Sequence, residues 1–434
     1  MKYYSTNGKA PIADLHKAVV KGLAEDRGLY MPEEIKKLPK AFFDDIQDMK
    51  FQDIAYNVAS AFFGEDVDLD ALKDIVYDTL SFDCPVVEVK ENIYSLELFH
   101  GPTLAFKDVG ARFMARLLQY FIRQEANHQQ VNVLVATSGD TGSAVANGFL
   151  GVEGIHVYVL YPKGKVSPIQ ECQFTTLGKN ITAIEVDGVF DDCQALVKNA
   201  FMDEALNQHM KLTSANSINV ARFLPQAFYY FNAYARMKAL GKADQLVMCV
   251  PSGNFGNICA ALFGHAMGLP IKRFIAANNA NDVFYNYLQT GRYEPKASVQ
   301  TLANAMDVGD PSNFARIYDL YGKSHERISS LISGATYNDD QIRETMRQCY
   351  QDTKYILDPH GACGYQALAD GLQAGEVGVF CETAHPAKFK EKVDDILGID
   401  VEIPDRLAAF MKGKKQSVPM TKDFSDFKAY LMKQ

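Results

Sequence analysis

Short apolar runs alternate with longer amphipathic stretches through most of this chain, and this alternation limits the fold more than any other feature. The runs are rich in Val, Ile and Leu and have the length of buried strands; they cover residues 93–99, 131–136, 156–160, 181–186, 246–250, 273–277 and 377–381. The stretches between them, such as residues 109–124 and 221–240, carry apolar side chains at helical spacing. Strands that alternate with helices form parallel sheets with crossover helices. The pattern therefore predicts a layered α/β protein.

The chain is long for a single compact core, and changes in its hydrophobic pattern suggest where the domain boundaries lie. It has 434 residues, more than one hydrophobic core usually serves. Residues 1–92 are predicted to form a helical N-terminal segment. The polar stretch 241–245 separates a first α/β domain, residues 93–240, from a second, residues 241–434, whose Lys-rich end is expected to dock loosely. We expect each α/β domain to hold an open, twisted, mostly parallel sheet.

Charge and cysteine usage exclude several classes of partner. Lys and Arg total 44 against 53 Asp and Glu, a net charge of −9, which argues against binding to nucleic acid or to an anionic membrane surface. No apolar stretch approaches the roughly 20 residues that span a bilayer. The eight cysteines form no CxxC pair and are expected to be mostly buried thiols of a cytoplasmic protein. Cys381 and His385 lack a second ligand pair, so no metal is expected.

Two glycine-rich turns follow predicted strands and precede predicted helices. Residues 137–143 read TSGDTGS, and residues 251–257 read PSGNFGN. Glycine lets the backbone approach a ligand, and free N–H groups at a helix start favour an anion such as phosphate. One such turn is a weak signal, but two of them at the carboxyl ends of strands favour a binding site. Residues 213–219 with Arg222 form a candidate second anion pocket, although Ser217 or Asn219 could simply cap a helix.

Lys107 lies in an apolar context where a predicted strand passes into a helix. Burial lowers the pKa of a lysine, which allows its amine to form a Schiff base near neutral pH. The alternative is a surface lysine whose stem lies along a helix. A lysine combined with a phosphate-binding turn is what pyridoxal phosphate requires. A sugar-phosphate aldolase needs similar parts, but its usual eightfold barrel does not emerge from this pattern.

Several segments together resemble the threonine synthase family, pyridoxal-phosphate enzymes with the fold type of tryptophan synthase β. The segments are residues 22–29, 100–108, 137–142, 216–222, 252–257 and 383–389. The resemblance extends over nearly the whole chain, with the motifs in the order of the family. Two residues depart from it: Arg27 stands where a Gly is expected, and Gly361 in the sequence PHGA is atypical.

The resemblance implies a cofactor site between the two sheet domains, centred on Lys107. This lysine would hold pyridoxal phosphate as a Schiff base and later act as the catalytic base. The other implied cofactor-binding residues are Asp140, Thr383 and, around the cofactor phosphate, Gly253, Asn254, Phe255, Gly256 and Asn257. The implied substrate-binding residues are Ser138, Thr141, Asn216, Ser217 and Arg222, the last three for a phosphate group. Thr383 would face the pyridine nitrogen.

The implied reaction converts O-phospho-L-homoserine and water into L-threonine and phosphate, by γ-elimination and β-addition of water. Two alternatives remain open at this point. One is another enzyme of the same fold type, such as a serine or threonine dehydratase, whose substrate has no phosphate to pair with Arg222. The other is a catalytically silent metabolite-binding protein, which an exposed Lys107 would favour. No oligomeric state is predicted.

Overall fold

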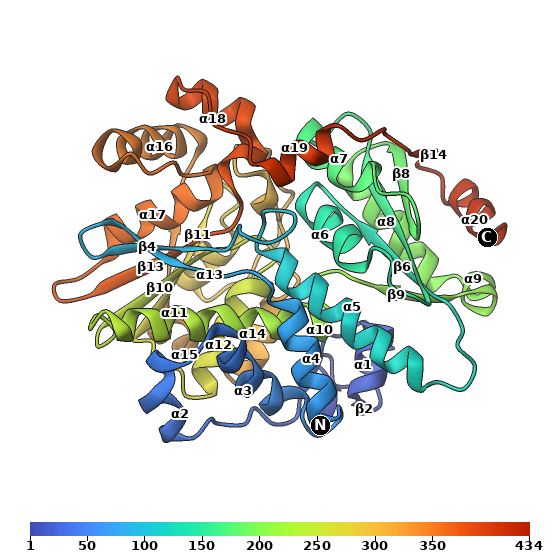
Figure 1. Ribbon diagram of the computed structural model, residues 1–434, viewed down its shortest axis with the longest axis horizontal. Helices are drawn as coiled ribbons and strands as arrows, with labels where there is room; N and C mark the ends of the chain where they lie inside the picture. The colour runs from blue at the N-terminus through green and yellow to red at the C-terminus, as the bar shows by residue number, and fades with distance from the viewer.

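The computed structural model describes residues 1–434 and is built around two sheets set side by side (Figure 1). The larger sheet has the order β12-β11-β10-β13-β5-β4, and only the edge strand β4 is antiparallel to its neighbour. Its strands are β4 (Val86–Lys90), β5 (Ile93–Glu97), β10 (Leu246–Pro251), β11 (Arg273–Asn278), β12 (Ile332–Thr336) and β13 (Val377–Glu382). All seven strands expected from the sequence are present across the two sheets, and the predicted α/β class is confirmed.

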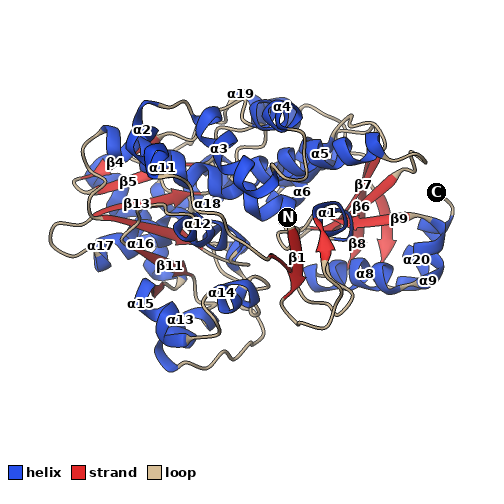
Figure 2. Cartoon of the chain, turned by 90° about the horizontal axis from the view of Figure 1, so that it is seen from below, coloured by secondary structure: helices blue, strands red, loops and turns tan.

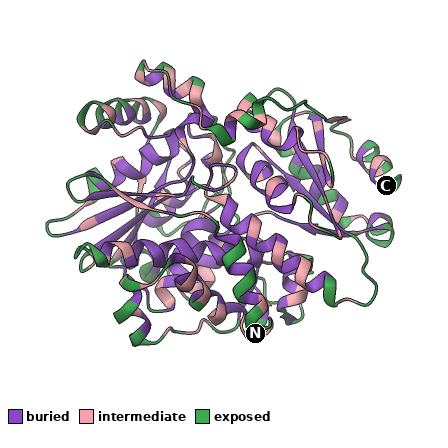
Figure 3. Ribbon diagram, in the orientation of Figure 1, coloured by how far each residue is buried: buried purple, intermediate pink, exposed green.

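The smaller sheet is wholly parallel and has the order β14-β8-β7-β6-β9. Its strands are β6 (Val131–Ala136), β7 (Ile155–Pro162), β8 (Ile181–Asp187), β9 (Lys211–Ser214) and β14 (Val418–Thr421). Every residue of β6 and of β10 is buried, as expected for central strands of parallel sheets that are covered on both faces. Buried residues therefore concentrate in the strands and in the helices between the two sheets (Figure 3).

Helices cover both sheets and fill the space between them. In the two α/β units they are α5 (Lys107–Gln124), α6 (Asp140–Phe149), α7 (Pro168–Thr175), α8 (Phe190–Met202), α9 (Glu204–His209), α10 (Val220–Phe223), α11 (Ala227–Ala239), α12 (Gly256–Ala266), α13 (Val283–Thr290), α14 (Phe314–Leu320), α15 (His325–Leu331), α16 (Asp339–Thr353), α17 (Pro359–Gly371), α18 (Lys390–Leu397) and α19 (Asp405–Met411). α6 and α8 pack on β6 and β7, and α17 packs on β10 and β13. None of the helices has the length and apolar character that crossing a membrane requires.

The helix expected over residues 221–240 is interrupted in the structure. α10 ends at Phe223, a 3₁₀ turn (η2) covers Leu224–Gln226, and α11 then continues to Ala239. Pro225 explains the break, because proline has no N–H to donate and its ring disfavours an α-helical interior. The interruption leaves Arg222 on a separate short helix.

The N-terminal segment is mainly helical, as expected, and also holds a small sheet that was not anticipated. Its helices are α1 (Leu15–Lys21), α2 (Lys40–Asp45), α3 (Phe51–Phe63) and α4 (Leu69–Thr79), and its antiparallel strands are β1 (Lys2–Ser5), β2 (Ala13–Asp14) and β3 (Tyr30–Pro32). α3 packs on α11, α4 packs on α5, and α1 lies beside β9 (Figure 2). Arg27 adopts a φ of 67°, the left-handed region that favours the Gly expected there.

Sheet membership does not follow the order of segments along the chain. β5, which begins at residue 93, pairs with β13 in the larger sheet, and β14 pairs with β8 in the smaller one. Each sheet therefore takes strands from both sides of residue 240. The division into residues 1–92, 93–240 and 241–434 stays a prediction of the sequence.

The Lys-rich C-terminal end is firmly docked, so the expectation of a loose tail is wrong. Besides β14 it forms α20 (Phe424–Met432), which packs on α8 and leads to the C-terminus (Figure 1). Phe427 and Leu431 of this helix are fully buried. They are four residues apart and so lie on one face of the helix, which lets the lysines of the segment remain in solvent.

Candidate active site

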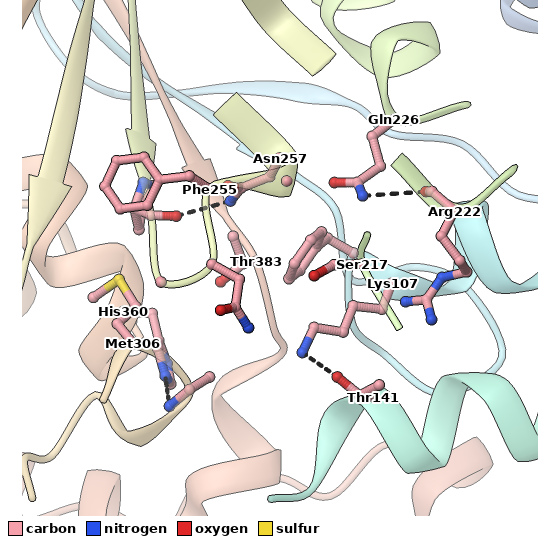
Figure 4. A pocket seen from close by; sticks show the side chains of 16 residues that line it. Lys107, Thr141, Ser217, Arg222, Gln226, Phe255, Asn257, Met306, His360 and Thr383 are labelled. Atoms are coloured by element: carbon pink, nitrogen blue, oxygen red, sulfur yellow. Dashed lines mark hydrogen bonds between the residues drawn. The ribbon is translucent and has the colours of Figure 1, made fainter. Parts of the chain in front are cut away.

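A pocket lies where the N-termini of α5 and α12 meet the segment that follows β13 (Figure 4). The residues that line it are Phe106, Lys107, Thr141, Ser217, Arg222, Gln226, Pro251, Gly253, Asn254, Phe255, Gly256, Asn257, Ala305, Met306, His360 and Thr383. Most residues singled out in the sequence are therefore brought together in one cavity. Asp140, Ser138 and Asn216 are not among the lining residues.

Lys107 is the first residue of α5, and its side chain extends into the pocket (Figure 4). Its Nζ donates a hydrogen bond of 2.6 Å to Thr141 Oγ1. Burial lowers the pKa of Lys107 to about 8, against the opposing effect of the Asp140 carboxylate. An amine with this pKa is partly neutral at physiological pH, as a nucleophile requires. The pocket position argues against the alternative of a surface lysine.

The backbone before Lys107 is held against the segment after β13. The Phe106 N–H donates to the Thr383 carbonyl at 2.8 Å, and Ala105 forms an isolated antiparallel bridge with Ala384. These bonds fix the start of α5 beside Thr383. The lysine and the threonine hydroxyl thus line the same cavity although they are distant in the sequence.

The turn after β10 lines the pocket with all five residues from Gly253 to Asn257. A Cβ added to Gly253 would lie 2.7 Å from the Ala305 carbonyl oxygen, so only glycine fits this close approach of two backbones. Phe255 has a φ of 66° and immediately precedes α12. The Asn257 side chain donates to the Pro251 carbonyl at 2.8 Å and closes the turn on itself. The result is a rigid turn whose backbone and helix start face the cavity.

Arg222 places a buried positive charge at the other side of the pocket. It is 2% exposed, its guanidinium donates to the Ala215 carbonyl, and its Nε has no hydrogen-bond partner. Burial lowers the pKa of Arg222 to about 10, which still leaves it charged near neutral pH. Gln226 supports it by donating to the Arg222 carbonyl at 3.2 Å. A buried guanidinium that lines a pocket suits an anionic ligand group.

The turn after β6 contributes only Thr141 to the pocket lining. Asp140 accepts from Lys388 Nζ at 2.5 Å and from Gln170 Nε2 at 3.0 Å. Although burial opposes ionisation, the Lys388 ammonium holds the pKa of Asp140 below its usual value. Its carboxylate is thus already paired. The cofactor contact of Asp140 and the substrate contacts of Ser138 and Asn216 stay predictions of the sequence.

Six lining residues were not anticipated from the sequence: Phe106, Gln226, Pro251, Ala305, Met306 and His360. Phe106 and Pro251 lie inside the segments 100–108 and 251–257 that were singled out, but neither was assigned to the site. Gln226 lies one helical turn after Arg222, which is also a readable signal. Ala305 and Met306 are small or apolar residues without a distinctive motif, so nothing in the sequence marks them.

The residues present fit pyridoxal phosphate. A lysine with a lowered pKa can hold its aldehyde, and the glycine-containing turn at the N-terminus of α12, which lines the cavity, suits its phosphate. The Thr383 hydroxyl is available in the same cavity. Arg222, a buried cation that lines the same cavity, suits a second anion.

Comparison with known proteins gives the same cofactor. A family model described as pyridoxal-phosphate dependent enzyme matches residues 78–381, and models of the threonine synthase N terminus and C-terminal region match residues 2–80 and 361–431. Threonine synthase from Haemophilus influenzae is 44% identical over 433 residues, covering 100% of both chains.

Solved structures agree with this assignment. The crystal structure of threonine synthase from Escherichia coli superposes with a TM-score of 0.93 at 42% identity, covering 100% of both chains. The crystal structure of PLP-bound threonine synthase from Brucella melitensis gives a TM-score of 0.93 at 32% identity, covering 100% of this chain and 99% of that one. The chain belongs to the threonine synthase family of pyridoxal-phosphate-dependent enzymes.

Proposed function

We propose that this enzyme converts O-phospho-L-homoserine and water into L-threonine and inorganic phosphate. The observation that carries the proposal is one cavity that holds Lys107, a glycine-lined turn and the buried Arg222. A reaction between a phosphate-bearing cofactor and a phosphate-bearing substrate needs two separate anion positions. The turn from Gly253 to Asn257 is assigned to the cofactor phosphate, and Arg222 with Ser217 to the substrate phosphate.

Lys107 is assigned the attachment of the cofactor and the transfer of protons at the substrate α carbon. Its pKa of about 8 lets Nζ both hold and release a proton near neutral pH. The Thr141 hydroxyl, 2.6 Å away, orients the amine. When bound, pyridoxal phosphate supplies an electron sink for the carbanion that proton removal leaves.

The remaining cofactor and substrate contacts are assigned to Thr383, to the β6 turn and to Asn216. The Thr383 hydroxyl is placed at the pyridine nitrogen, where a neutral group keeps the ring less protonated than a carboxylate would. Ser138 and Thr141 are assigned to the substrate carboxylate, and Asn216 joins Arg222 at the substrate phosphate. Asp140 remains assigned to the cofactor side, next to the amine that its charge influences. The cytoplasmic location expected from the sequence is part of the same proposal.

The test is a coupled assay of phosphate and threonine with O-phospho-L-homoserine and added pyridoxal phosphate. Arg222→Ala is expected to keep the cofactor absorbance and to lose at least about 100-fold in kcat/KM, because a buried charged contact is removed. Arg112→Ala is a matched control, because Arg112 donates to the carbonyls of Thr79 and Asp78 and does not line the pocket. It should retain activity.

Two outcomes would contradict the proposal. If Arg222→Ala released phosphate as fast as the unaltered enzyme, Arg222 would not hold the substrate phosphate. If the enzyme deaminated serine or threonine efficiently and left O-phospho-L-homoserine intact, it would be a dehydratase of the same fold type.

A further inference from the structure

Three ionisable side chains lie behind the pocket, and the proposed reaction uses none of them. Asp358 and Glu382 are fully buried, and His360 is 3% exposed. Asp358 precedes α17, His360 lies in its first turn, and Glu382 is the last residue of β13, immediately before Thr383. Buried ionisable groups are costly unless they are paired, so their arrangement calls for an explanation.

His360 links this cluster to the pocket wall. Its Nδ1 lies 2.6 Å from Asp358 Oδ2, and its Nε2 accepts a hydrogen bond of 3.1 Å from the Ala305 N–H (Figure 4). Because Nε2 is an acceptor, a neutral ring carries its proton on Nδ1 and donates it to Asp358. The carboxylate therefore fixes both the orientation and the tautomer of the imidazole.

Asp358 is itself held in place from two sides. As the N-cap of α17, it accepts from the Gly361 N–H at 2.9 Å, and its own N–H donates to Glu382 Oε1 at 3.2 Å. Burial raises the pKa of Glu382 well above its usual value. Although burial opposes ionisation of Asp358, its bonds to Glu382 and His360 outweigh that effect and hold its pKa below its usual value. A Cβ on residue 361 would lie 2.2 Å from Glu382 Oε2, which explains the atypical Gly361.

Ala305, which donates to His360, lies in turn against the backbone of the glycine-lined turn. Ala305 belongs to a 3₁₀ turn (η3, Asn304–Met306). Its carbonyl oxygen would lie 2.7 Å, and the Met306 Cα 3.1 Å, from a Cβ at Gly253. The other side of the η3 turn is held by Asn279, whose Nδ2 donates to the Ala303 carbonyl at 3.1 Å. The His360 bond is the one that faces the pocket.

We propose that His360 is a positioning residue: oriented by Asp358, with Glu382 packed behind it, it holds the η3 turn against the Gly253–Asn257 turn and so sets the width of the cofactor-phosphate cradle. This inference rests on the proposed placement of that phosphate. It gives the cluster a binding role toward the cofactor without contact to the reacting atoms. It also explains why a histidine lines a pocket whose proton transfers are assigned to Lys107.

The experiment measures cofactor affinity apart from turnover. Protein freed of cofactor is titrated with pyridoxal phosphate and followed by absorbance. His360→Ala is expected to raise the Kd about tenfold, because the partly buried Ala305 N–H and the buried Asp358 carboxylate both lose a partner. His360→Gln offers an amide oxygen to the same N–H and should recover part of the affinity. His325→Ala is the matched control. His325 Nε2 lies 2.9 Å from the Leu288 carbonyl oxygen, and neither residue lines the pocket.

A second readout follows the η3 turn directly. Amide hydrogen exchange in a peptide containing Ala305 should be faster in cofactor-free His360→Ala than in the unaltered protein, and unchanged in His325→Ala. An unchanged Kd in His360→Ala and His360→Gln would overturn the inference, and so would a raised Kd with unaltered exchange at Ala305. An unaltered protein that binds the cofactor but forms no threonine would contradict the proposed function only.

Discussion

The two glycine-rich turns have similar sequences and opposite roles in the structure. After β6, Thr137 Oγ1 accepts from the N–H groups of Gly139 and Gly142, at 2.9 and 2.8 Å. The Gln170 amide covers the same turn, because a Cβ on Gly139 would lie 2.6 Å from it. After β10, the residues from Gly253 to Asn257 all line the pocket. The first turn is closed by its own contacts, whereas the second lines the pocket with five consecutive residues.

The difference shows what a glycine-rich turn after a strand does and does not predict. Glycine permits close approach of another group, but that group can be protein or ligand. Gln170 and Lys388 occupy the surroundings of the β6 turn, so this turn contributes a hydroxyl, that of Thr141, to the pocket. In the β10 turn, the atoms nearest to an added Cβ are backbone atoms of Ala305 and Met306 at Gly253, and atoms of Asn313 and Ser217 at Gly256. The neighbours that pack on a turn therefore decide its function.

The largest expected effect is that of replacing Lys107, which contacts the β6 turn and lines the same pocket as the β10 turn. Lys107→Ala removes the amine that bonds Thr141 and lies beside the cradle. We expect kcat to fall at least about 10³-fold, because the variant loses both the attachment point and the base. Borohydride reduction followed by mass spectrometry should find the cofactor on Lys107 in the unaltered enzyme. Trapping on another side chain would contradict the assignment of both turns.

The closure of the first turn predicts a large loss of stability when Lys388 is replaced. Lys388 is fully buried in the 3₁₀ turn η4 (Pro386–Phe389) and pairs with Asp140. Lys388→Met leaves the Asp140 carboxylate buried without its partner, which should lower the free energy of unfolding by about 3–5 kcal/mol in urea titrations. Combining Lys388→Met with Asp140→Asn should restore part of the lost free energy of unfolding, because no unpaired carboxylate then remains.

The matched control for this substitution is Lys390→Met. Lys390 pairs with Asp394 and with Asp400, of which Asp400 is 95% exposed. Because water reaches these groups, the loss of Lys390 should lower the free energy of unfolding much less than the loss of Lys388. Equal costs for Lys388→Met and Lys390→Met would mean that the ion pair does not hold the β6 turn closed.

The openness of the second turn predicts a loss of cofactor affinity when a methyl group is added at Gly253. Gly253→Ala would force the turn away from Ala305, and we expect the Kd for pyridoxal phosphate to rise about 10- to 100-fold, in line with the usual cost of overpacking. Gly371→Ala is the control, because its Cβ would meet only Ile275 Cδ1 at 3.5 Å. Similar affinities for the two variants would show that the cradle does not hold the cofactor.

The pH dependence of cofactor attachment tests whether Lys107, which lies between the two turns, is buried. Burial lowers the pKa of Lys107 from 10.5 to about 8, so the neutral amine predominates only above that pH. The attachment rate should rise about tenfold per pH unit below pH 8 and level off above it, because only the unprotonated amine reacts. Stopped-flow absorbance with cofactor-free protein measures this profile. A rate that keeps rising beyond pH 10 would indicate an unburied lysine.

Much of the site could be predicted because its chemistry is local in the sequence. Lys107 and the turn from Gly253 to Asn257 each follow a strand and open a helix, and those signals lie within a few residues. The central strands were equally readable, because their apolar runs need no partner to be recognised. The docking of α20 was missed, although the four-residue spacing of Phe427 and Leu431 is a weak local signal for a buried helix face.

The rest could not be predicted, because it depends on contacts between distant segments. Lys388 closes the β6 turn from the far end of the chain, and nothing near Asp140 announces that pairing. Ala305 reaches the cradle through its backbone, which carries no side-chain signal. His360 and its partner Asp358 lie beside the atypical Gly361 and could have been noticed, but Glu382, which accepts from the Asp358 N–H, comes from the distant strand β13. Such contacts appear only once the two sheets are assembled.

The smallest expected effect compares the side chains that stabilise the two turns from within. Thr137→Val keeps the volume but leaves the N–H groups of Gly139 and Gly142 without their acceptor, whereas Ser252→Ala removes one bond, from Ser252 Oγ to the Val250 carbonyl at 3.0 Å. The valine variant should therefore lose about 1 kcal/mol more unfolding free energy in urea titrations. Thr137→Ser retains the hydroxyl and should lose less than Thr137→Val. If Thr137→Val were no more destabilising than Ser252→Ala, the internal bonds of the β6 turn would not be what separates it from the open turn after β10.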